Sequence, residues 1–394
     1  MSSLSFLFDR LIRVTLFYFL LVALLVIGIP SVVVLYHLHG TVRSPEENVL
    51  PNTIQLSLDN TVVLNEKDEK EPKSLPMLHL GKAPVTFGWV SGTTVQAENY
   101  QKLQIVSPYL AELDSSTPVK PVLTRQKIVS WHEKGLKVWG RVDLDNQTAS
   151  GAHDYLTSPE IMNEDIAQLK AYVSGNHLDG LNIDIENVRA ADRSSFLSFV
   201  ALLSREVKSA QPNTAITVDI QAESGFSHDS AVSYNRALAR ASDYVIFMGY
   251  DEHWGSDPNP GPVASLQWLK DNVRRMIQAD LPSDKLLLGL PSYTRIWKVG
   301  SQGQNLSSRA VSNEYINNVL NEEQISQRWQ SRAGAYFSTF SYRGAPYEVW
   351  SEDTAGVQSL LKLVSESHLA GFGFWSLDMM SSGQWNTLAK SWRP

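Results

Sequence analysis

Two acids and an amide alternate with apolar residues in HLDGLNIDIENV, the segment 177–188. Asn182, Asp184 and Glu186 are separated by single apolar residues, and side chains of a β-strand point to opposite faces with a period of two. The three polar groups therefore share one face, while the apolar residues predict a buried strand. Burying a carboxylate costs free energy unless it is paired or hydrogen-bonded. The pattern predicts that this face belongs to a functional site.

The rest of the chain predicts the elements that position this strand. After Gly81, short apolar strands alternate with helical segments, which is typical of βα units around a parallel sheet. Eight such units predict an α/β fold of the (β/α)8, or TIM-barrel, class, which needs about 250 residues. The expected strands are Val85–Trp89, Leu103–Ser107, Lys137–Val142, Gly180–Ile185, Ala215–Ile220, Tyr244–Gly249, Lys285–Leu290 and Gly371–Trp375. Helices are expected between them, among them Leu123–Glu133, Ser158–Val173, Ala190–Ala210, Val263–Ala279 and Asp353–Ser365.

The connection after the seventh strand is too long for a plain βα loop. Residues 292–352 contain two strand-like stretches, Ala335–Tyr342 and Pro346–Trp350, on either side of a short turn-like segment. They predict a small α+β insertion beside the mouth of the barrel. A doubly wound sheet is the competing fold, but it would need a Gly-rich phosphate loop at the start of a helix, and the sequence has none.

The N-terminal part of the chain predicts a membrane anchor. Val14–Tyr36 is an apolar run that would span about 34 Å as a helix. Arg10 and Arg13 precede it, so the positive-inside rule places the N-terminus in the cytoplasm and the rest of the chain outside, on a single-pass membrane protein. A cleaved signal peptide is the alternative, but the run is long for one and no clear cleavage site follows it. The expected organisation is a cytoplasmic N-terminus (1–13), a transmembrane signal anchor (14–36), a polar tether (37–80) and a barrel (81–394, with its insertion at about 292–352).

Composition and charge exclude several classes of protein. A chain of 394 residues with 43% hydrophobic residues can bury a large core. The net charge of -7 and the lack of a basic stripe argue against a nucleic-acid partner. Cysteine is absent, which excludes disulfides and thiolate chemistry. The nine histidines show no metal-ligand spacing, so neither a metal nor another cofactor is expected.

Polar and aromatic residues gather at the predicted strand ends. The fourth strand ends in Asp184–Glu186, the sixth in Met248–Asp251 and the eighth in Trp375–Asp378. The active site of a (β/α)8 barrel lies at the C-terminal ends of its strands, so these groups are expected to meet at one mouth. Tryptophan faces stack on sugar rings, and acids and amides can bond sugar hydroxyls. The mouth is therefore expected to bind a glycan.

These segments resemble glycoside hydrolase family 18, the chitinase-like barrels. DGLNIDIE at 179–186 is similar to the family signature DxxDxDxE, with Asp179 and Gly180 at its start. Further segments are similar to the family motifs on strands six, seven and eight: MGYD (248–251), LGLPSYTRIW (288–297) and GFGFWSLD (371–378). Residues 250–268 and 348–353 resemble most closely the branch with the spore-cortex peptidoglycan hydrolases and the hydrolase-like domains attached to exopolysaccharide synthesis.

The resemblance implies retaining hydrolysis in which the N-acetyl oxygen of the substrate itself attacks the anomeric carbon. Glu186 would be the general acid and then the base, and Asp184 would orient the acetamido group. Tyr250 would hydrogen-bond the acetamido carbonyl, Asp251 would hold a sugar hydroxyl, and Trp375 would floor the subsite of the cleaved sugar. Other substrate-binding candidates are Asn182, Met248, Trp89, Trp254, Tyr293 and Trp297.

One position departs from the family signature. Asn182 stands where the signature has its middle aspartate, which in chitinases can share a proton with its neighbour. Asn182 can hydrogen-bond Asp184 but cannot take its charge, so the proton relay is expected to differ. Asparagine is common here in the peptidoglycan-directed branch, so the change bears more on the substrate class than on activity. Asp179 is expected to receive hydrogen bonds at the start of the strand.

The sequence therefore predicts a membrane-anchored glycosidase that cleaves β-linked N-acetylglucosamine in an envelope or extracellular polysaccharide. Peptidoglycan, chitin and poly-N-acetylglucosamine all remain open as the polymer, as do internal and terminal cleavage. A catalytically silent barrel that binds such glycans is one alternative. An accessory subunit of a polysaccharide synthesis or export machine, recruited through the anchor, is another.

Overall fold

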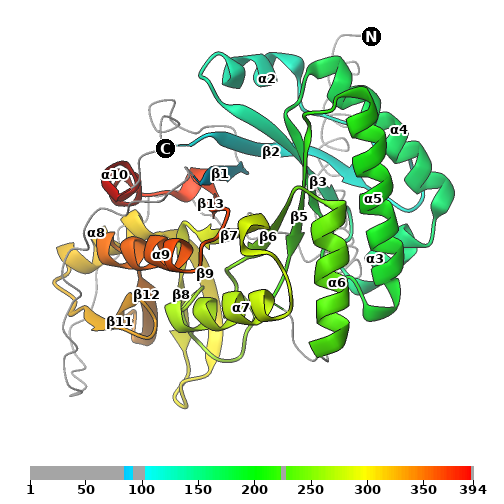
Figure 1. Cartoon of the computed structure of the whole chain (residues 1–394). Helices are drawn as coiled ribbons and strands as arrows, with labels where there is room; N and C mark the ends of the chain where they lie inside the picture. The colour runs from blue at the N-terminus through cyan, green and yellow to red at the C-terminus, as the bar shows by residue number, and fades with distance from the viewer. Residues whose placement is uncertain (1–83, 92–102, 223–227, 392–394) are drawn as a thin grey trace, which may run out of the picture. The chain divides into compact units, whose positions relative to one another are not determined.

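The barrel expected from the sequence is confirmed. The structure is a computed structural model that describes residues 84–91, 103–222 and 228–391. Parallel strands close into a barrel in the order β1-β13-β7-β6-β5-β4-β3-β2 (Figure 1). They are β1 (Val85–Val90), β2 (Ile105–Leu113), β3 (Lys137–Leu144), β4 (Gly180–Asp184), β5 (Ala215–Ile220), β6 (Tyr244–Met248), β7 (Leu286–Pro291) and β13 (Gly371–Trp375). Sequence neighbours pair along most of the barrel, as right-handed βα units require.

The expected anchor, Val14–Tyr36, and the tether at 37–80 lie outside the described residues. Across 84–91, 103–222 and 228–391, no helix combines the length and the apolar character needed to cross a bilayer.

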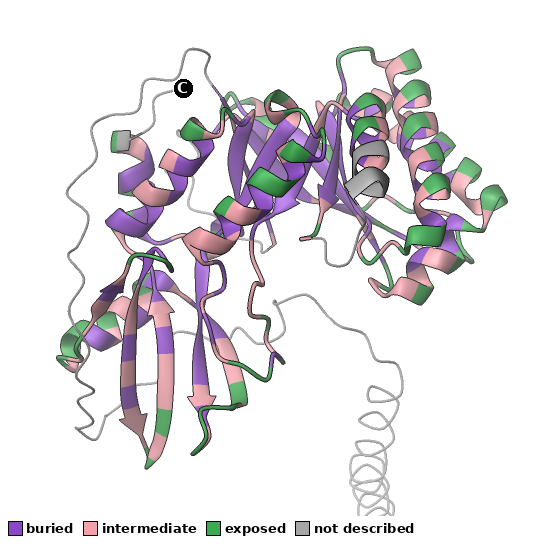
Figure 2. Ribbon diagram, turned by 60° about the horizontal axis from the view of Figure 1, so that its bottom comes forward, coloured by how far each residue is buried: buried purple, intermediate pink, exposed green. Residues whose placement is uncertain are grey.

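Helices cover the outside of the barrel. They are α2 (Arg125–His132), α3 (Ala149–Leu156), α4 (Pro159–Asn176), α5 (Arg193–Ala210), α6 (His228–Ala241), α7 (Leu266–Gln278), α9 (Thr354–Glu366) and α10 (Ser382–Ser391), with single 3-10 turns at Ala190–Asp192, Ser283–Lys285 and Leu377–Met379. Local sequence explains their starts: Pro159 is the first residue of α4, and Ser265 accepts a hydrogen bond from the Trp268 amide at the start of α7. Figure 2 shows the exposed residues on the outer faces of these helices and the buried residues on the strands.

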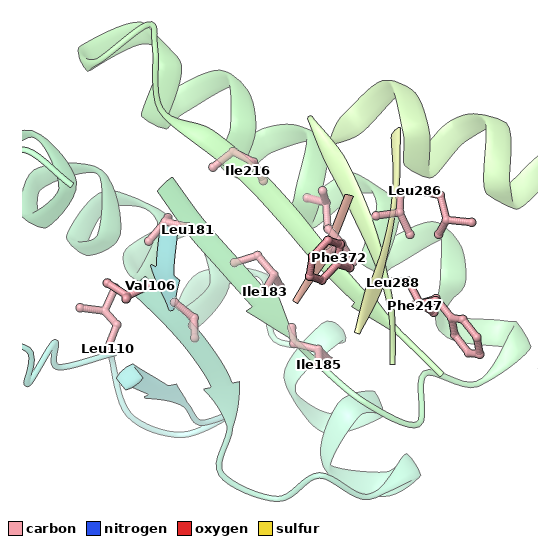
Figure 3. Close-up of a cluster of buried hydrophobic side chains, with 14 of the residues drawn as sticks. Val106, Leu110, Leu181, Ile183, Ile185, Ile216, Phe247, Leu286, Leu288 and Phe372 are labelled. Atoms are coloured by element: carbon pink, nitrogen blue, oxygen red, sulfur yellow. The ribbon is translucent and has the colours of Figure 1, made fainter. Parts of the chain in front are cut away.

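The apolar residues of β4 pack outward, against the helices. Leu181, Ile183 and Ile185 belong to the core cluster between strands and helices, part of which Figure 3 shows. α5 closes this layer with a buried face at Phe196, Phe199, Val200, Leu203 and Val207, the spacing of an amphipathic helix. The alternate residues of β4 therefore point into the barrel, where Trp89 and other aromatic residues form a second cluster.

The insertion after β7 is also confirmed, and it holds a larger sheet than expected. Antiparallel strands pair in the order β10-β11-β12-β8-β9. The elements are β8 (Tyr293–Val299), β9 (Asn305–Ser312), α8 (Asn313–Glu322), β10 (Arg328–Gln330), β11 (Ala335–Tyr342) and β12 (Ala345–Ser351). β8 follows β7 after Ser292, so the two strands read as one apolar motif in the sequence, and β9 is too polar for the alternation to reveal it.

Candidate active site

Three aspartates lie side by side on neighbouring strands, near the C-terminal ends of β3, β4 and β5. The register pairs Asp143 of β3 with Asp184 of β4. Asn182 pairs with Thr217 of β5, so Asp219, two residues further on, comes beside Asp184 from the other side. Directly opposed residues of neighbouring strands lie about 5 Å apart at their Cβ atoms. The carboxylate of Asp184 is therefore flanked by a carboxylate on each neighbouring strand.

Asn182 is fully buried and uses all its hydrogen-bonding capacity. Its Oδ1 accepts from Trp89 Nε1 at 2.7 Å and from Ser107 Oγ at 3.2 Å. Its Nδ2 donates to Thr217 Oγ1 at 3.1 Å and to Asp219 Oδ1 at 2.7 Å. An amide nitrogen has two hydrogens to donate, and both go to β5. Asn182 therefore ties β4 to β1, β2 and β5 from inside the barrel, rather than contacting a substrate.

Asn182 has no amide hydrogen left to donate to Asp184, so the hydrogen bond that the sequence allows between them does not form. Asp184 is 7% exposed, and its Oδ1 has no hydrogen-bond partner among the residues that the structure describes. Burial, and then the charges of Asp219 and Glu186, raise the pKa of Asp184 well above its usual value. A buried acceptor that the protein leaves unsatisfied is available to a donor on a bound ligand.

Glu186 follows β4 and is held by two glutamines, which lie in the segments that follow β3 and β5. Its amide donates to Gln147 Oε1 at 2.8 Å, while Gln147 Nε2 donates to the Asp184 carbonyl at 2.7 Å. Gln147 thus holds the backbone on both sides of Ile185. Gln221, which follows β5, donates from Nε2 to Glu186 Oε2 at 2.6 Å. Both the backbone and the carboxylate of Glu186 are therefore fixed.

The carboxyl group of Glu186 can hold a proton near neutral pH. Burial, followed by the charges of Asp251 and Asp143, raises the pKa of Glu186 to about 7, while the positive charge of Arg141 opposes the shift. A general acid works best when its pKa lies near the working pH, since it must be protonated and still release the proton. This environment suits the acid and base role that the sequence predicts for Glu186.

A buried ion pair on β3 adds a fixed cation to the site. Arg141 donates to Asp143 through Nε at 2.7 Å and Nη2 at 2.9 Å. Its guanidinium carbon lies 4.7 Å from the centre of the Trp375 ring, within cation–π range. Arg141 was not predicted as a site residue, although it alternates with apolar residues on β3 just as the acids do on β4. The same period-two pattern could have identified it.

Aromatic residues from β1, β13 and the segment just after β6 support one another at the mouth. Tyr250 and Trp375 stack with their ring centres 6.2 Å apart. Trp89 meets both rings edge-on, at 6.2 Å from Tyr250 and 5.7 Å from Trp375. Trp89 was expected to line the cleft, but it is 0% exposed, so the structure corrects that role: it supports the two rings and Asn182 from inside the barrel. Burial raises the pKa of Tyr250 further above neutral pH, so its hydroxyl remains a donor.

The insertion contributes the residues that hold Asp251. Tyr293 of β8 donates its hydroxyl to Asp251 Oδ1 at 2.9 Å, and Arg295 Nη2 lies 3.9 Å from the same oxygen. Asp251 has a φ of 57°, a left-handed conformation that aspartate tolerates better than most residues. Burial raises the pKa of Asp251, and Arg295 opposes that shift. Tyr293 is fully buried, so the expectation that it lines the cleft is corrected: it orients Asp251 instead.

The other candidates for the cleft lining differ in how far their side chains are exposed. Trp254 is 50% exposed and donates to Ser256 Oγ at 3.1 Å, so it remains available to a ligand. Trp297 is fully buried in β8 and donates to the Gly261 carbonyl at 2.8 Å, which corrects its assignment to the cleft lining. Met248 is the buried last residue of β6.

The first two signature residues lie at the opposite, N-terminal end of β4. Asp179 Oδ2 accepts from the Val138 amide at 2.8 Å and lies 2.8 Å from His132 Nε2. A Cβ on Gly180 would lie 2.4 Å from Cδ1 of Trp139, so only glycine fits. These positions join β4 to β3, far along the strand from the acids at its other end.

Two further observations concern possible ligand sites. Within the described part of the chain, no three His, Cys, Asp or Glu side chains are grouped so as to hold a metal ion. A cavity of about 870 Å³ lies between α7 and the insertion, lined by residues that include Glu252, Trp268, Arg332 and Trp350. It adjoins the loop that carries Asp251 but includes none of the acids of β3, β4 and β5.

A closed (β/α)8 barrel with clustered carboxyl groups and stacked aromatic residues at its C-terminal mouth is a barrel-enzyme architecture whose site can take a sugar. The sequence profile of the glycosyl hydrolases family 18 matches residues 83–379, so the chain belongs to that family. The chain is therefore a glycoside hydrolase.

Known proteins similar to this chain include two relatives found by sequence and a chitinase found by structure. The uncharacterized glycosylase YvbX of Bacillus subtilis is 23% identical over 332 residues, which cover 78% of this chain and 91% of YvbX. The cortical fragment-lytic enzyme of the same organism is 24% identical over 330 residues, or 77% of this chain and 74% of that enzyme. The crystal structure of a chitinase from Chromobacterium violaceum superimposes with a TM-score of 0.69 at 22% identity, covering 78% of this chain and 99% of the chitinase. At that identity, the superposition shows a shared fold.

Proposed function

We propose that this family 18 enzyme hydrolyses β-linked N-acetylglucosamine in an envelope or extracellular polysaccharide, by substrate-assisted retaining catalysis. One observation carries the proposal. Glu186, with a pKa of about 7, stands two residues from Asp184, whose Oδ1 has no partner among the described residues. A protonated acid and an unsatisfied acceptor on one strand face are the two groups that an acetamido-bearing sugar needs.

In the proposed reaction, Glu186 gives its proton to the glycosidic oxygen as that bond breaks. The N-acetyl oxygen of the same sugar attacks the anomeric carbon and forms a cyclic oxazolinium ion. Asp184 accepts the acetamido N–H and stabilises the positive charge that develops on the ring. Tyr250 donates its hydroxyl to the acetamido oxygen and holds it for attack. Glu186, now a carboxylate, then takes a proton from the water that opens the ring.

Peptidoglycan is the first polymer to test, because a relative is named for lysis of cortical fragments. Chitin and poly-N-acetylglucosamine carry the same acetamido group, so the site chemistry described above suits all three. We further propose that the apolar run at Val14–Tyr36 anchors the chain in the cell membrane with the barrel outside, where such polymers occur. The anchor is also where a polysaccharide synthesis or export machine would recruit the chain.

The test compares the full chain with Glu186→Gln for release of reducing ends from peptidoglycan, chitin oligomers and poly-N-acetylglucosamine. The substitution keeps the shape of the side chain and removes the acid. We expect the variant to lose at least about a hundredfold in rate, the typical contribution of a positioned general acid. Glu160→Gln, an exposed position in the first turn of α4, is the matched control and should keep full activity.

Two results would contradict the proposal. If the wild-type chain cleaves none of the polymers but both proteins bind one of them, the barrel is a glycan-binding module. If Glu186→Gln retains wild-type rates, another group is the acid. Membrane anchoring is tested separately: the full chain should sediment with membranes and its barrel should be digested by external protease, while a chain without residues 14–36 should not sediment.

A further inference from the structure

Asp219 is a buried acid that the proposed mechanism does not use. It lies on β5 beside Asp184, is 4% exposed, and its Oδ1 accepts a hydrogen bond from Asn182 at 2.7 Å. Asp143, the flanking acid on β3, differs because Arg141 binds it through two hydrogen bonds. Asp184 and Asp219, called the aspartate pair below, therefore adjoin each other without the bidentate arginine that Asp143 has.

The remaining charged and titratable groups around the aspartate pair come from β3 and from the ends of β4 and β6. Asp143 and Arg141 face it from β3, with opposite signs. Glu186 faces it from the end of β4, and Tyr250 from the end of β6. The negative charge of Asp251, the residue after Tyr250, raises the pKa of Glu186. Two neighbouring carboxyl groups in such a buried, mostly acidic setting do not both ionise at neutral pH, because the second negative charge is repelled by the first.

We propose that Asp219 shares a single proton with Asp184, and so takes in this chain the place of the signature aspartate that Asn182 replaces. When a substrate N–H binds Asp184, the proton resides on Asp219 and Asp184 is the anion. When the substrate leaves, the proton is again distributed between them, so none is gained or lost. Asn182 donates to Asp219 Oδ1, which leaves Oδ2 to carry the proton.

Asp219 is in this sense a positioning residue, because it acts on the reaction only through Asp184. The catalytic consequence rests on the proposed function, whereas the sharing of the proton is a property of the protein alone. The two can therefore fail separately, and the experiments below distinguish them.

The first experiment follows the proton without any substrate. Infrared spectra of the full chain with ¹³C-labelled aspartate, in the Glu186→Gln background, report the carbonyl stretch of protonated aspartic acids as the pH rises. Adding Asp219→Asn removes the neighbouring charge from Asp184. With Asp219 present, the second carboxyl group of the pair must lose its proton beside a negative charge. For carboxyl groups about 5 Å apart and an effective dielectric constant of about 20, Asp184 in the Asp219→Asn variant should lose its proton about two pH units below that last deprotonation. A displacement below about half a unit would overturn the proposal.

The second experiment uses the direction of a shift in the pH profile of kcat/KM, whose alkaline limb reports Glu186. If the pair shares one proton, Asp219→Asn confines its single negative charge to Asp184, the nearer neighbour of Glu186. The alkaline limb should then move to higher pH. If both acids were ionised, the same substitution would remove a charge and move the limb to lower pH, and if both were protonated it would not move. Either of these results would overturn the proposal.

Two further variants distinguish an effect of the shared proton from an effect of packing. Exchanging the two residues, in the double variant Asn182→Asp and Asp219→Asn, keeps their hydrogen bond and should return the limb to the wild-type pH. Thr217→Val removes the other acceptor of Asn182 without changing charge, and should leave the limb in place. A limb displaced equally by Thr217→Val would mean that Asp219 only holds Asn182. If the wild-type chain cleaves no polymer, the proposed function fails, but the infrared titration still decides whether the proton is shared.

Discussion

Gln147 offers the sharpest test of how the fold positions the acid. Its side chain makes two hydrogen bonds to the backbone on either side of Ile185, at 2.7 Å and 2.8 Å. Each such bond contributes about 1 kcal/mol net, and a carbonyl left without a partner costs a similar amount again. Gln147→Ala should therefore lower the free energy of unfolding by about 2 to 3 kcal/mol.

The same substitution should affect catalysis more than binding. Without the two hydrogen bonds, the segment that carries Glu186 is free to move, and a misplacement of about 1 Å can cost roughly a hundredfold in rate. We expect kcat to fall by about ten- to a hundredfold. KM should change little, because Gln147 contacts the protein backbone rather than the predicted sugar subsite.

The assay is steady-state hydrolysis of the polymer that the wild-type enzyme cleaves, with chemical denaturation of the same samples. Gln327→Ala is the matched control, since Gln327 makes an exposed hydrogen bond to Asn321 in the insertion and should leave both quantities unchanged. The reasoning is refuted if Gln147→Ala retains wild-type kcat, or if the loss is confined to KM. An unfolded variant would be recognised by circular dichroism, and Gln147→Glu, which can still accept from the Glu186 amide, would then replace it.

Three other predictions follow from single groups. Tyr250→Phe keeps the stack on Trp375 and removes one donor, so kcat should fall by about a hundredfold with little change in stability; an unchanged kcat would exclude the hydroxyl from the reaction. Activity of the wild-type enzyme should decline as the pH rises through about 7, where Glu186 loses its proton, and a profile flat to pH 9 would contradict that assignment. Burial and then Asp353 raise the pKa of Glu352 from 4.5 to about 8, so between these pH values the folded state holds a proton that the unfolded chain has released, and stability falls as the pH rises through this window. Glu352→Gln should therefore raise the melting temperature at pH 9 relative to wild type and have less effect at pH 5; equal effects at both would show that Glu352 is not protonated on folding.

Periodicity along the chain was sufficient to predict the class of fold and one wall of the site. The alternation in β4 separates Leu181 and Ile183, which pack against the helices, from Asn182 and Asp184, which face into the barrel. Such patterns are local, since a strand turns its side chains to alternate faces wherever it lies. The order of βα units then implied a closed sheet, because parallel neighbours joined by helices wind in one direction. The N-terminal anchor also rests on local hydropathy, and stays a prediction.

The chemistry that surrounds Glu186 depended on the tertiary structure, because it comes from residues that neighbouring strands bring together. Gln147 and Gln221 lie 39 and 35 positions from Glu186 in the chain, and both contact it only because β3, β4 and β5 pair in one register. The burial of each site residue also depended on the tertiary structure. Sequence alone identified Trp89 as an aromatic residue near a strand end, but packing inside the barrel decides that it supports Asn182 rather than a sugar. Residue types can be read along the chain, whereas exposure and the charges that neighbouring groups impose exist only once the barrel has closed.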